Sequence, residues 1–198
     1  NMKLPGSITD ILVRQNGTVT SRDIAAVGVS RTMLGRYVAE GLLERAFYGV
    51  YVSPGTICDE HFALSRRFDR IVFSHVTALF LHGLSERTPF EHSISVRSDE
   101  TIPASLREKA RCFYVRPALF DLGLGTVRTQ FGNLVPCHDP ERTVCDMIRD
   151  RSRVDDETFL AAMRNYVAWK GRNLSRLGEY AHSMGVERRV NAIMEVLV

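Results

Sequence analysis

The sequence lacks any long apolar run and any closely spaced pair of cysteines. No stretch approaches the roughly 18 apolar residues that suggest a membrane-spanning helix. The first ten residues contain no apolar core of a signal peptide. The four cysteines, Cys58, Cys112, Cys137 and Cys145, form neither a CxxC pair nor a compact disulfide spacing. These absences favour a cytoplasmic protein with reduced, mostly buried thiols and no membrane partner.

Motifs of catalysis and metal binding are also missing. The sequence contains no phosphate-binding P-loop, no GxSxG and no HExxH. Cys58 and His61 have C-x2-H spacing, and Cys137 and His138 are adjacent, but structural zinc sites take two ligand pairs at C-x2-C or H-x3-5-H spacing, which this set does not provide. Lys109 and Lys170, the only lysines beyond the N-terminal segment, do not lie among clustered carboxylates as a metal nuclease would require. We therefore expect no catalytic residue, no metal and no cofactor.

The composition is that of an ordinary globular protein. Of 198 residues, 44% are hydrophobic and 25% are charged, which permits one large domain or two small ones. The formal net charge of +3 is a weak indication of a nucleic-acid partner.

Capping signals predict two short helices at the start of the chain. Ser7 followed by Asp10 resembles a capping box, and residues 16–17, Asn-Gly, end the helix that it begins. Thr20 with Asp23 gives a second capping box. Residues 18–20 are expected only to bridge the two helices.

A tight turn at Gly28 leads to a third predicted helix. Ser30 is a favourable N-cap, and the helix should run from Arg31 to about Glu40. Two helices joined by such a turn form a helix-turn-helix, in which the last one enters the major groove. The expected outward positions are small or basic: Arg31, Thr32, Gly35, Arg36 and Ala39.

The residues that follow predict a two-stranded wing. Residues 42–44 and 49–52 are the expected strands, with residues 45–48 as the turn. The predicted DNA-binding set is Arg22, Ser30, Arg31, Thr32, Arg36, Arg45 and Tyr48. A protein-binding winged helix is the alternative, because the module has six basic side chains against four acidic ones.

The remaining chain predicts a small mixed sheet followed by helices. The overall expectation is an α+β fold, with a winged helix-turn-helix domain at residues 1–55 and a mixed α/β domain with a helical C-terminal tail at residues 56–198. Expected helices span residues 59–67, 75–82, 140–149, 155–169, 174–184 and 186–197, and expected strands span residues 70–73, 92–97, 111–115, 124–129 and 134–138.

The most distinctive polar pattern lies at the start of the helix predicted at residues 140–149. Asp139 suits an N-cap, Glu141 complements the helix dipole, and Arg142 with Asp146 forms an i,i+4 pair. Helix architecture explains these residues; alternatively, the four side chains form a cluster that binds a partner or a phosphate. His75 and His82 share a helix face, but no further metal ligands are evident beside them.

Taken in order, these motifs resemble the AbiEi-type antitoxins of type IV toxin–antitoxin systems. The winged-helix part of the resemblance rests on residues 17–20, 28–30, 34, 41–43 and 49–51, and the later part rests on residues 74–79, 81–84, 139–143 and 146. The resemblance runs over nearly the whole chain, and the order and spacing of the motifs make it specific.

The resemblance implies a bifunctional protein. The winged helix would bind inverted repeats of double-stranded promoter DNA and repress its own operon. The second domain would neutralise a nucleotidyltransferase-like toxin, without need of a stable complex, and its candidate residues are Asp139, Glu141, Arg142 and Asp146. Two alternatives stay open: an enzyme that modifies the toxin as an atypical kinase, and a ligand-sensing transcription regulator without a toxin partner.

Overall fold

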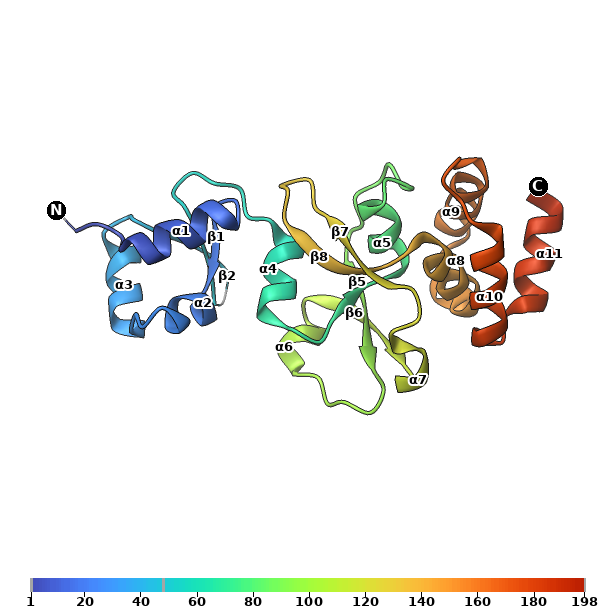
Figure 1. Ribbon diagram of the computed structural model, residues 1–198, viewed down its shortest axis with the longest axis horizontal. Helices are drawn as coiled ribbons and strands as arrows, with labels where there is room; N and C mark the ends of the chain where they lie inside the picture. Colours follow the sequence, from blue (N-terminus) through green and yellow to red (C-terminus); the bar gives the residue numbers. More distant parts are fainter. Residues whose placement is uncertain (1, 48, 198) are drawn as a thin grey trace. The chain divides into compact units, whose positions relative to one another are not determined.

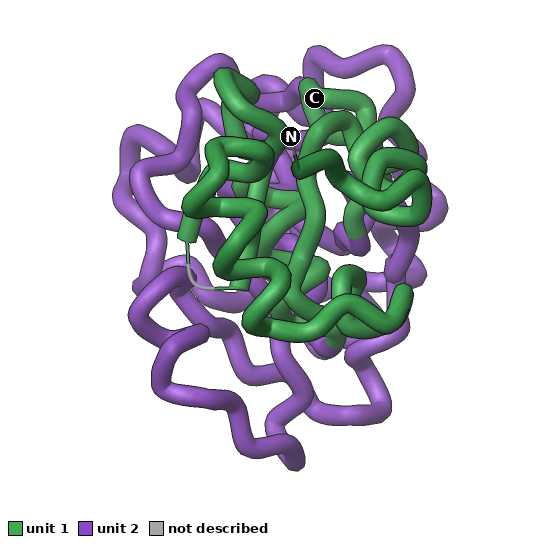
Figure 2. Tube along the Cα trace, turned by 90° about the vertical axis from the view of Figure 1, so that its left-hand side faces the viewer, with its two compact units in different colours: residues 1–69, 128–135 green, residues 70–127, 136–198 purple. Residues whose placement is uncertain are grey.

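The computed structural model describes residues 2–47 and 49–197 (Figure 1). The chain forms two compact units, and neither is continuous in sequence. Unit 1 comprises residues 1–69 and 128–135, and unit 2 comprises residues 70–127 and 136–198 (Figure 2). The domain boundary predicted between residues 55 and 56 stays a prediction about the extent of the DNA-binding domain.

Unit 1 contains the expected winged helix-turn-helix arrangement. Its three-stranded antiparallel sheet has the order β1-β3-β2, and Val19 pairs with Tyr51 in the register of β1 and β3. The small core beneath it includes Ile8, Ile24 and Leu34, which are all under 5% exposed. The elements are α1 (Gly6–Arg14), β1 (Thr18–Thr20), α2 (Ser21–Ala26), α3 (Arg31–Ala39), β2 (Glu44–Phe47), β3 (Val50–Val52) and α4 (Glu60–Arg67).

Two of the three predicted helix starts in this unit are confirmed. The Thr20 hydroxyl accepts a hydrogen bond from the Asp23 amide, and the Asp23 carboxylate accepts one from the Thr20 amide, so the capping box at α2 is complete. The Ser30 hydroxyl caps α3. The capping box predicted at Ser7 is wrong, because the N-cap of α1 is Pro5, two residues earlier, and it makes no side-chain cap.

The wing differs from its prediction in two respects. Arg45 lies within β2 rather than in the turn, because Leu43 packs into the core at 1% exposure instead of forming a strand. The segment expected to be a bridge, Thr18–Thr20, is a third strand, β1. Residue Tyr48, which was assigned to the wing tip, lies outside the described residues.

The tip of the hairpin between β7 (Leu124–Arg128) and β8 (Leu134–His138) completes unit 1. Asp59 is 0% exposed and caps α4 by accepting from the Phe62 amide at 3.1 Å. Its other oxygen accepts from the Thr129 hydroxyl at 2.6 Å and from the Asn133 amide at 2.9 Å. Asn16, at the end of α1, donates to the Asn133 side-chain oxygen at 3.1 Å. The hairpin tip is therefore hydrogen-bonded both to α4 and to the turn after α1.

Unit 2 holds a five-stranded mixed sheet of order β6-β5-β4-β8-β7. Strand β4 is antiparallel to β5 and parallel to β8, and β5 is parallel to β6. The confirmed fold class is thus α+β. The elements are β4 (Val72–Phe73), α5 (His75–Leu81), β5 (His92–Arg97), α6 (Ala104–Arg107), β6 (Ala110–Val115), α7 (Pro117–Phe120), β7 (Leu124–Arg128), β8 (Leu134–His138), α8 (Pro140–Arg149), the 3-10 turn η1 (Arg151–Arg153), α9 (Asp156–Ala168), α10 (Leu174–Met184) and α11 (Glu187–Leu197).

Helix α8 is the centre of the helical part of unit 2. All its residues from Pro140 to Ile148 are buried, and α5, α9, α10 and α11 pack against it (Figure 1). Asp139 and Pro140 hold the predicted N-cap and first helical positions. Among the described residues, no helix has the length and apolar character needed to cross a membrane.

Candidate nucleic-acid interface

Helix α3 has one buried face and one exposed face. Leu34 and Tyr37 are each 4% exposed and anchor the helix to the core of unit 1. The Ser30 hydroxyl accepts from the Met33 amide at 3.2 Å and fixes the N-terminal turn. The residues predicted to face outward are all exposed, namely Arg31, Thr32, Gly35, Arg36 and Ala39.

The two arginines of this exposed face are available to contact an external partner. Within the described part of the chain, neither Arg31 nor Arg36 forms an ion pair. They are five residues apart on a helix whose outward positions between and beside them carry small side chains. A narrow, basic surface of this kind can approach base edges and phosphates without steric or electrostatic conflict.

Arg22 on α2 lies in a different electrostatic setting. Its guanidinium holds both oxygens of Asp69, at 2.9 Å and 3.4 Å. This hydrogen bonding raises the pKa of Arg22 above its ordinary value. Both side chains remain more than half exposed, at 57% and 68%, so water competes with the pair. A phosphate would have to displace the Asp69 carboxylate in order to bind the Arg22 guanidinium.

The wing adds Arg45 as an exposed residue of β2, where it stands opposite Tyr51 of β3. Gly49 follows in the turn with φ +75°, a backbone conformation that favours glycine, and an added Cβ would lie 3.2 Å from the Ser21 hydroxyl. Gly49 therefore lies close to the start of α2, the helix that precedes α3.

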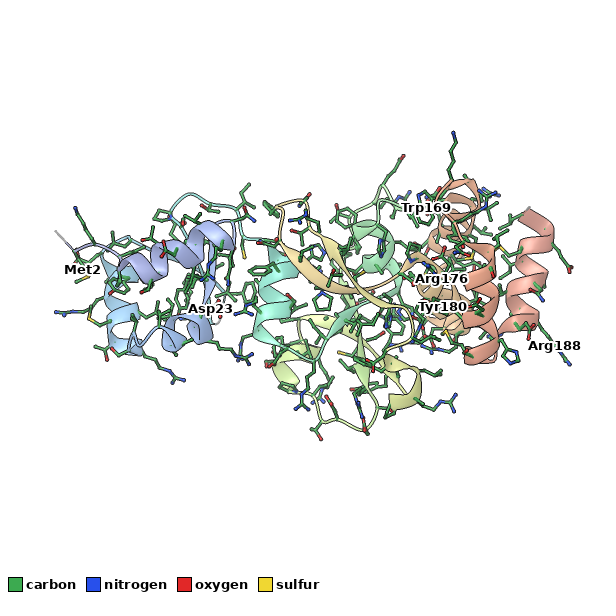
Figure 3. The ribbon with its side chains drawn as sticks, viewed as in Figure 1. Met2, Asp23, Trp169, Arg176, Tyr180 and Arg188 are labelled. Carbon is green, nitrogen blue, oxygen red and sulfur yellow. The ribbon has the colours of Figure 1, made fainter. Side chains whose placement is uncertain are left out.

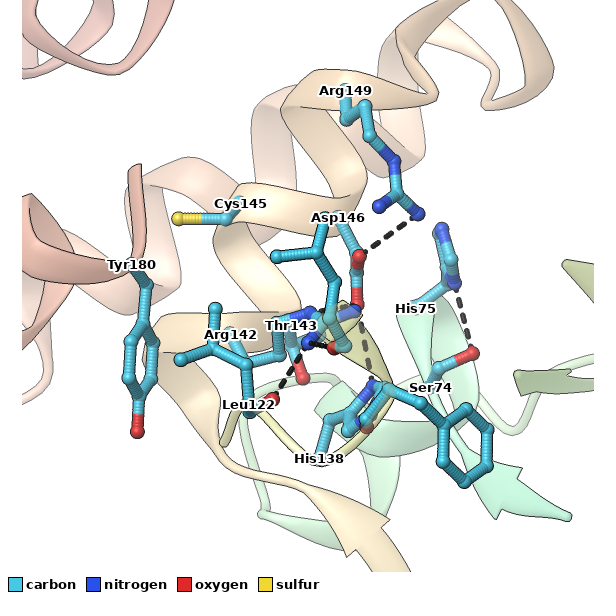
Figure 4. Close-up of polar contacts among 12 residues, drawn as sticks. Ser74, His75, Leu122, His138, Arg142, Thr143, Cys145, Asp146, Arg149 and Tyr180 are labelled. Carbon is cyan, nitrogen blue, oxygen red and sulfur yellow. Dashed lines mark hydrogen bonds and ion pairs between the residues drawn. The ribbon is translucent and has the colours of Figure 1, made fainter. Parts of the chain in front are cut away.

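The four predicted toxin-neutralisation residues occupy a different environment from an exposed binding cluster. Glu141, Arg142 and Asp146 are 1%, 0% and 0% exposed, and Asp139 is partly buried. The Arg142 guanidinium donates to Asp146 at 3.1 Å and to the backbone carbonyls of Leu119 and Leu122. Arg142 thus joins α8 to the loop around α7 (Figure 4).

Further buried groups complete the surroundings of Asp146. His138 Nδ1 lies 3.3 Å from one Asp146 oxygen, and Arg149 Nη2 lies 3.0 Å from the other. Burial alone would raise the pKa of Asp146, but the hydrogen bond with His138 and the neighbouring cations lower it well below its ordinary range. Asp146 is therefore an ionised, buried carboxylate.

Glu141 and Asp139 connect α8 to the next two helices. Glu141 Oε1 accepts from the Tyr166 hydroxyl of α9 at 3.0 Å and from the Asn173 amide, at the N-cap of α10, at 2.8 Å. Asp139 caps α8 and accepts from the Tyr180 hydroxyl of α10 at 2.9 Å. Burial, followed by this hydrogen bond, raises the pKa of Tyr180 to about 12. These contacts give the cluster a structural role, and a part in toxin neutralisation stays a prediction.

His75, Asp146 and Asp150 bring three possible metal-ligand atoms within 4.8 Å of one another. Arg149 Nη2 lies 3.0 Å from an oxygen of each carboxylate, so a guanidinium supplies the positive charge there. His75 Nε2 is 3.0 Å from Asp150, and burial lowers the pKa of His75. Sequence reasoning did not predict that His138 and Arg149 lie beside Asp146. The helical spacing of Arg142, Asp146 and Arg149 was the signal available in the sequence.

The arrangement of unit 1 defines a class of protein. Three helices, a tight turn at Gly28 between α2 and α3, and a β-hairpin after the third helix form a winged helix-turn-helix. Residues 7–54 match the family described as transcriptional regulator, AbiEi antitoxin. The resemblance expected from the sequence is confirmed over this module.

A solved structure extends the comparison to the whole fold. The crystal structure of the RV2827C protein from Mycobacterium tuberculosis is 15% identical, with a TM-score of 0.52, over 98% of this chain and 83% of that chain. At this identity the similarity concerns the fold alone. The search of curated proteins gives no match.

Proposed function

We propose that this protein is a DNA-binding antitoxin that represses its own toxin–antitoxin operon. The observation that carries the proposal is the exposed face of α3, where Arg31 and Arg36 lie among small side chains, in a module that matches the AbiEi regulators. The DNA-binding domain would comprise residues 1–55, and the antitoxin domain would comprise residues 56–198.

In this proposal α3 enters the major groove of promoter DNA. Arg31, Thr32 and Arg36 contact base edges, because they occupy the N-terminal and central part of the exposed face. Arg45 and Tyr48 of the wing contact the backbone, and Arg22 joins them when a phosphate replaces Asp69. Two copies of the protein would occupy the two halves of an inverted repeat.

The second part of the proposal is neutralisation of a nucleotidyltransferase-like toxin by unit 2. The antitoxin description of the matching family supports it. Because Glu141, Arg142 and Asp146 are buried, they would act by holding α8, α9 and α10 in position. The toxin itself would meet exposed side chains of these helices.

Operator binding tests the first part. A titration of the protein against its own upstream DNA and against a scrambled duplex, followed by fluorescence anisotropy, should give sequence-dependent affinity. Arg36→Ala should weaken operator binding by about 1–3 kcal/mol if it contacts a base edge. The matched control is Arg188→Ala on α11, whose side chain projects away from its unit (Figure 3). Equal losses for the two variants would contradict the assignment of α3.

Co-expression tests the second part. Cells that carry the neighbouring nucleotidyltransferase-like gene should grow only when this protein is present. Incubating the protein and toxin with labelled ATP separates the enzymatic alternative, because transfer of label to the toxin would identify a kinase. Protection without transfer supports a non-catalytic antitoxin.

A further inference from the structure

Unit 2 contains a cavity that neither the DNA-binding surface nor the buried polar cluster uses. Its volume is about 640 Å³, which lies within the range of small-molecule sites. It lies among α5, the loop of residues 84–91, β5, β6, residues 153–155 and α9. All of these elements belong to unit 2.

The inner wall of the cavity is apolar. Leu79, Leu84, Phe113 and Ala162 line it, and each is less than 6% exposed. At the rim, Phe90 is fully exposed, although an aromatic ring is more stable in an apolar environment than in water. The apolar part of a ligand inside the cavity would provide a surface against which the Phe90 ring could pack.

Two arginines lie together over one ring of this wall. The Arg153 guanidinium carbon is 4.1 Å from the Phe113 ring centroid, and that of Arg111 is 5.7 Å from it. Within residues 2–47 and 49–197, neither arginine forms an ion pair; Arg153 donates only to the Cys112 carbonyl, at 3.3 Å. Both guanidinium groups lie near the same ring, and an anion that reached them would accept charge-assisted hydrogen bonds from each.

The remaining charged groups of the lining are largely occupied. Glu157 pairs with Arg87 at 2.7 Å, and the Asp155 carboxylate caps α9 by accepting from the Thr158 amide at 2.8 Å. Glu86 and Glu91 are exposed on the rim loop. His75 stacks on Phe113 at 3.5 Å and contributes an aromatic ring to the inner wall.

We propose that this cavity binds a small amphipathic anion. Its carboxylate or phosphate head would lie between Arg111 and Arg153, and its aromatic or aliphatic body would fill the apolar interior beneath Phe90. Planar guanidinium groups suit both kinds of head, which accept charge-assisted hydrogen bonds. The site is independent of the proposed DNA binding and toxin neutralisation.

Displacement of a fluorescent dye tests the proposal on the full chain. Anilinonaphthalene sulfonate combines an aromatic body with one anionic group, and its emission should rise in the cavity. Phenylacetate and phenyl phosphate should displace it, and the stronger of the two identifies the preferred head. Benzylamine, with the same ring and a positive charge, should not compete. Stronger displacement by benzylamine would overturn the proposal, because Glu86 and Glu91 would then determine the selectivity.

Variants locate the site. Arg111→Gln with Arg153→Gln should weaken dye and phenylacetate binding about ten-fold or more, because both charge-assisted contacts are lost. Arg116→Gln is the matched control, because Arg116 is an exposed arginine that directly follows β6 and lies outside the cavity lining. Ala161→Trp should block the cavity from its exposed position on α9. Unchanged phenylacetate affinity in both the double variant and Ala161→Trp, with circular dichroism confirming their folding, would refute the site.

Discussion

Arg142 and Asp146 form an ion pair within one helix, and both side chains are 0% exposed. Such a pair stabilises little by its mere presence, because desolvation offsets much of the attraction between the charges. Its removal on one side is costly, however, since the other charge stays buried without its partner. Substituting one member of the pair should therefore destabilise unit 2.

We predict that Arg142→Met lowers the free energy of unfolding by about 3–5 kcal/mol. The loss arises because Asp146 keeps its charge while the Leu119 and Leu122 carbonyls lose their donor. Urea unfolding followed by circular dichroism measures it. Arg164→Met, at an exposed position of α9, should change stability by less than about 0.5 kcal/mol. The double variant Arg142→Met with Asp146→Leu should be more stable than Arg142→Met alone; a further loss would contradict this account.

A second prediction concerns Gly123, which lies against the side chain of Arg142. It has φ +71°, and a Cβ there would lie 2.5 Å from the Arg142 Cβ. Gly123→Ala should therefore destabilise the protein by about 1–3 kcal/mol, as overpacking does. Gly178→Ala is the matched control, because that glycine lies within α10 with open space around it. This control should gain about 0.5–1 kcal/mol in thermal or urea unfolding. Similar effects at both glycines would show that Arg142 does not crowd the turn.

The stability of the folded protein should depend on pH through His75. Burial lowers the pKa of His75 in the folded protein, whereas an unfolded histidine titrates near pH 6.5. Below about pH 6.5 the unfolded chain binds a proton that folded His75 does not, so stability falls as the pH falls. This residue contributes at most about 1.4 kcal/mol per pH unit. Asp150, Asp146, Arg149 and Ser74 face the imidazole and set the size of the shift.

His75→Asn tests this linkage. Asparagine tolerates the left-handed backbone that His75 adopts at φ +49°. Urea unfolding between about pH 5 and 7 should show a shallower pH dependence in the variant than in the unaltered protein. His182→Asn, an exposed histidine on α10, should leave the slope as it is. The same slope in all three proteins would rule out the assignment to His75.

The fourth prediction concerns the pair between Arg22 and Asp69. Asp69→Asn should release Arg22 for a phosphate and remove a negative charge from unit 1. DNA affinity should rise, and the slope of log K against log salt should become steeper by about 0.9, the value for one added phosphate contact. Glu157→Gln changes a similarly exposed ion pair in unit 2 and is the matched control. An unaltered salt slope for Asp69→Asn would show that Arg22 does not contact DNA.

Elements with a strong local signal were predicted well from the sequence. The alternating pattern of residues 92–97 predicted β5 with the observed bounds, and Asp139-Pro140 placed the start of α8 correctly. Strand β1 was missed because three residues are too few to show an alternating pattern. In the wing, Leu42 and Leu43 have the composition of a strand but lie before it, and Leu43 is buried in the core.

At the candidate sites too, local sequence patterns predicted some features, whereas features that depend on tertiary contacts were missed. Helical spacing was enough to predict which side of α3 is exposed. The same spacing paired Arg142 with Asp146 but gave no sign that both are buried. Their burial comes from segments distant in sequence, such as the carbonyls of Leu119 and Leu122, which no local pattern connects to α8.

The contacts of Asp59 have a consequence for how the protein is made. This buried carboxylate accepts one of its hydrogen bonds from Asn133, a residue 74 positions further along the chain. On the ribosome, the helices and wing of unit 1 emerge well before that donor has been synthesised. Unit 1 therefore cannot reach its final hydrogen-bonded state until the β7–β8 hairpin has also left the exit tunnel, so its maturation has to wait for the synthesis of residues 70–127, which belong to unit 2.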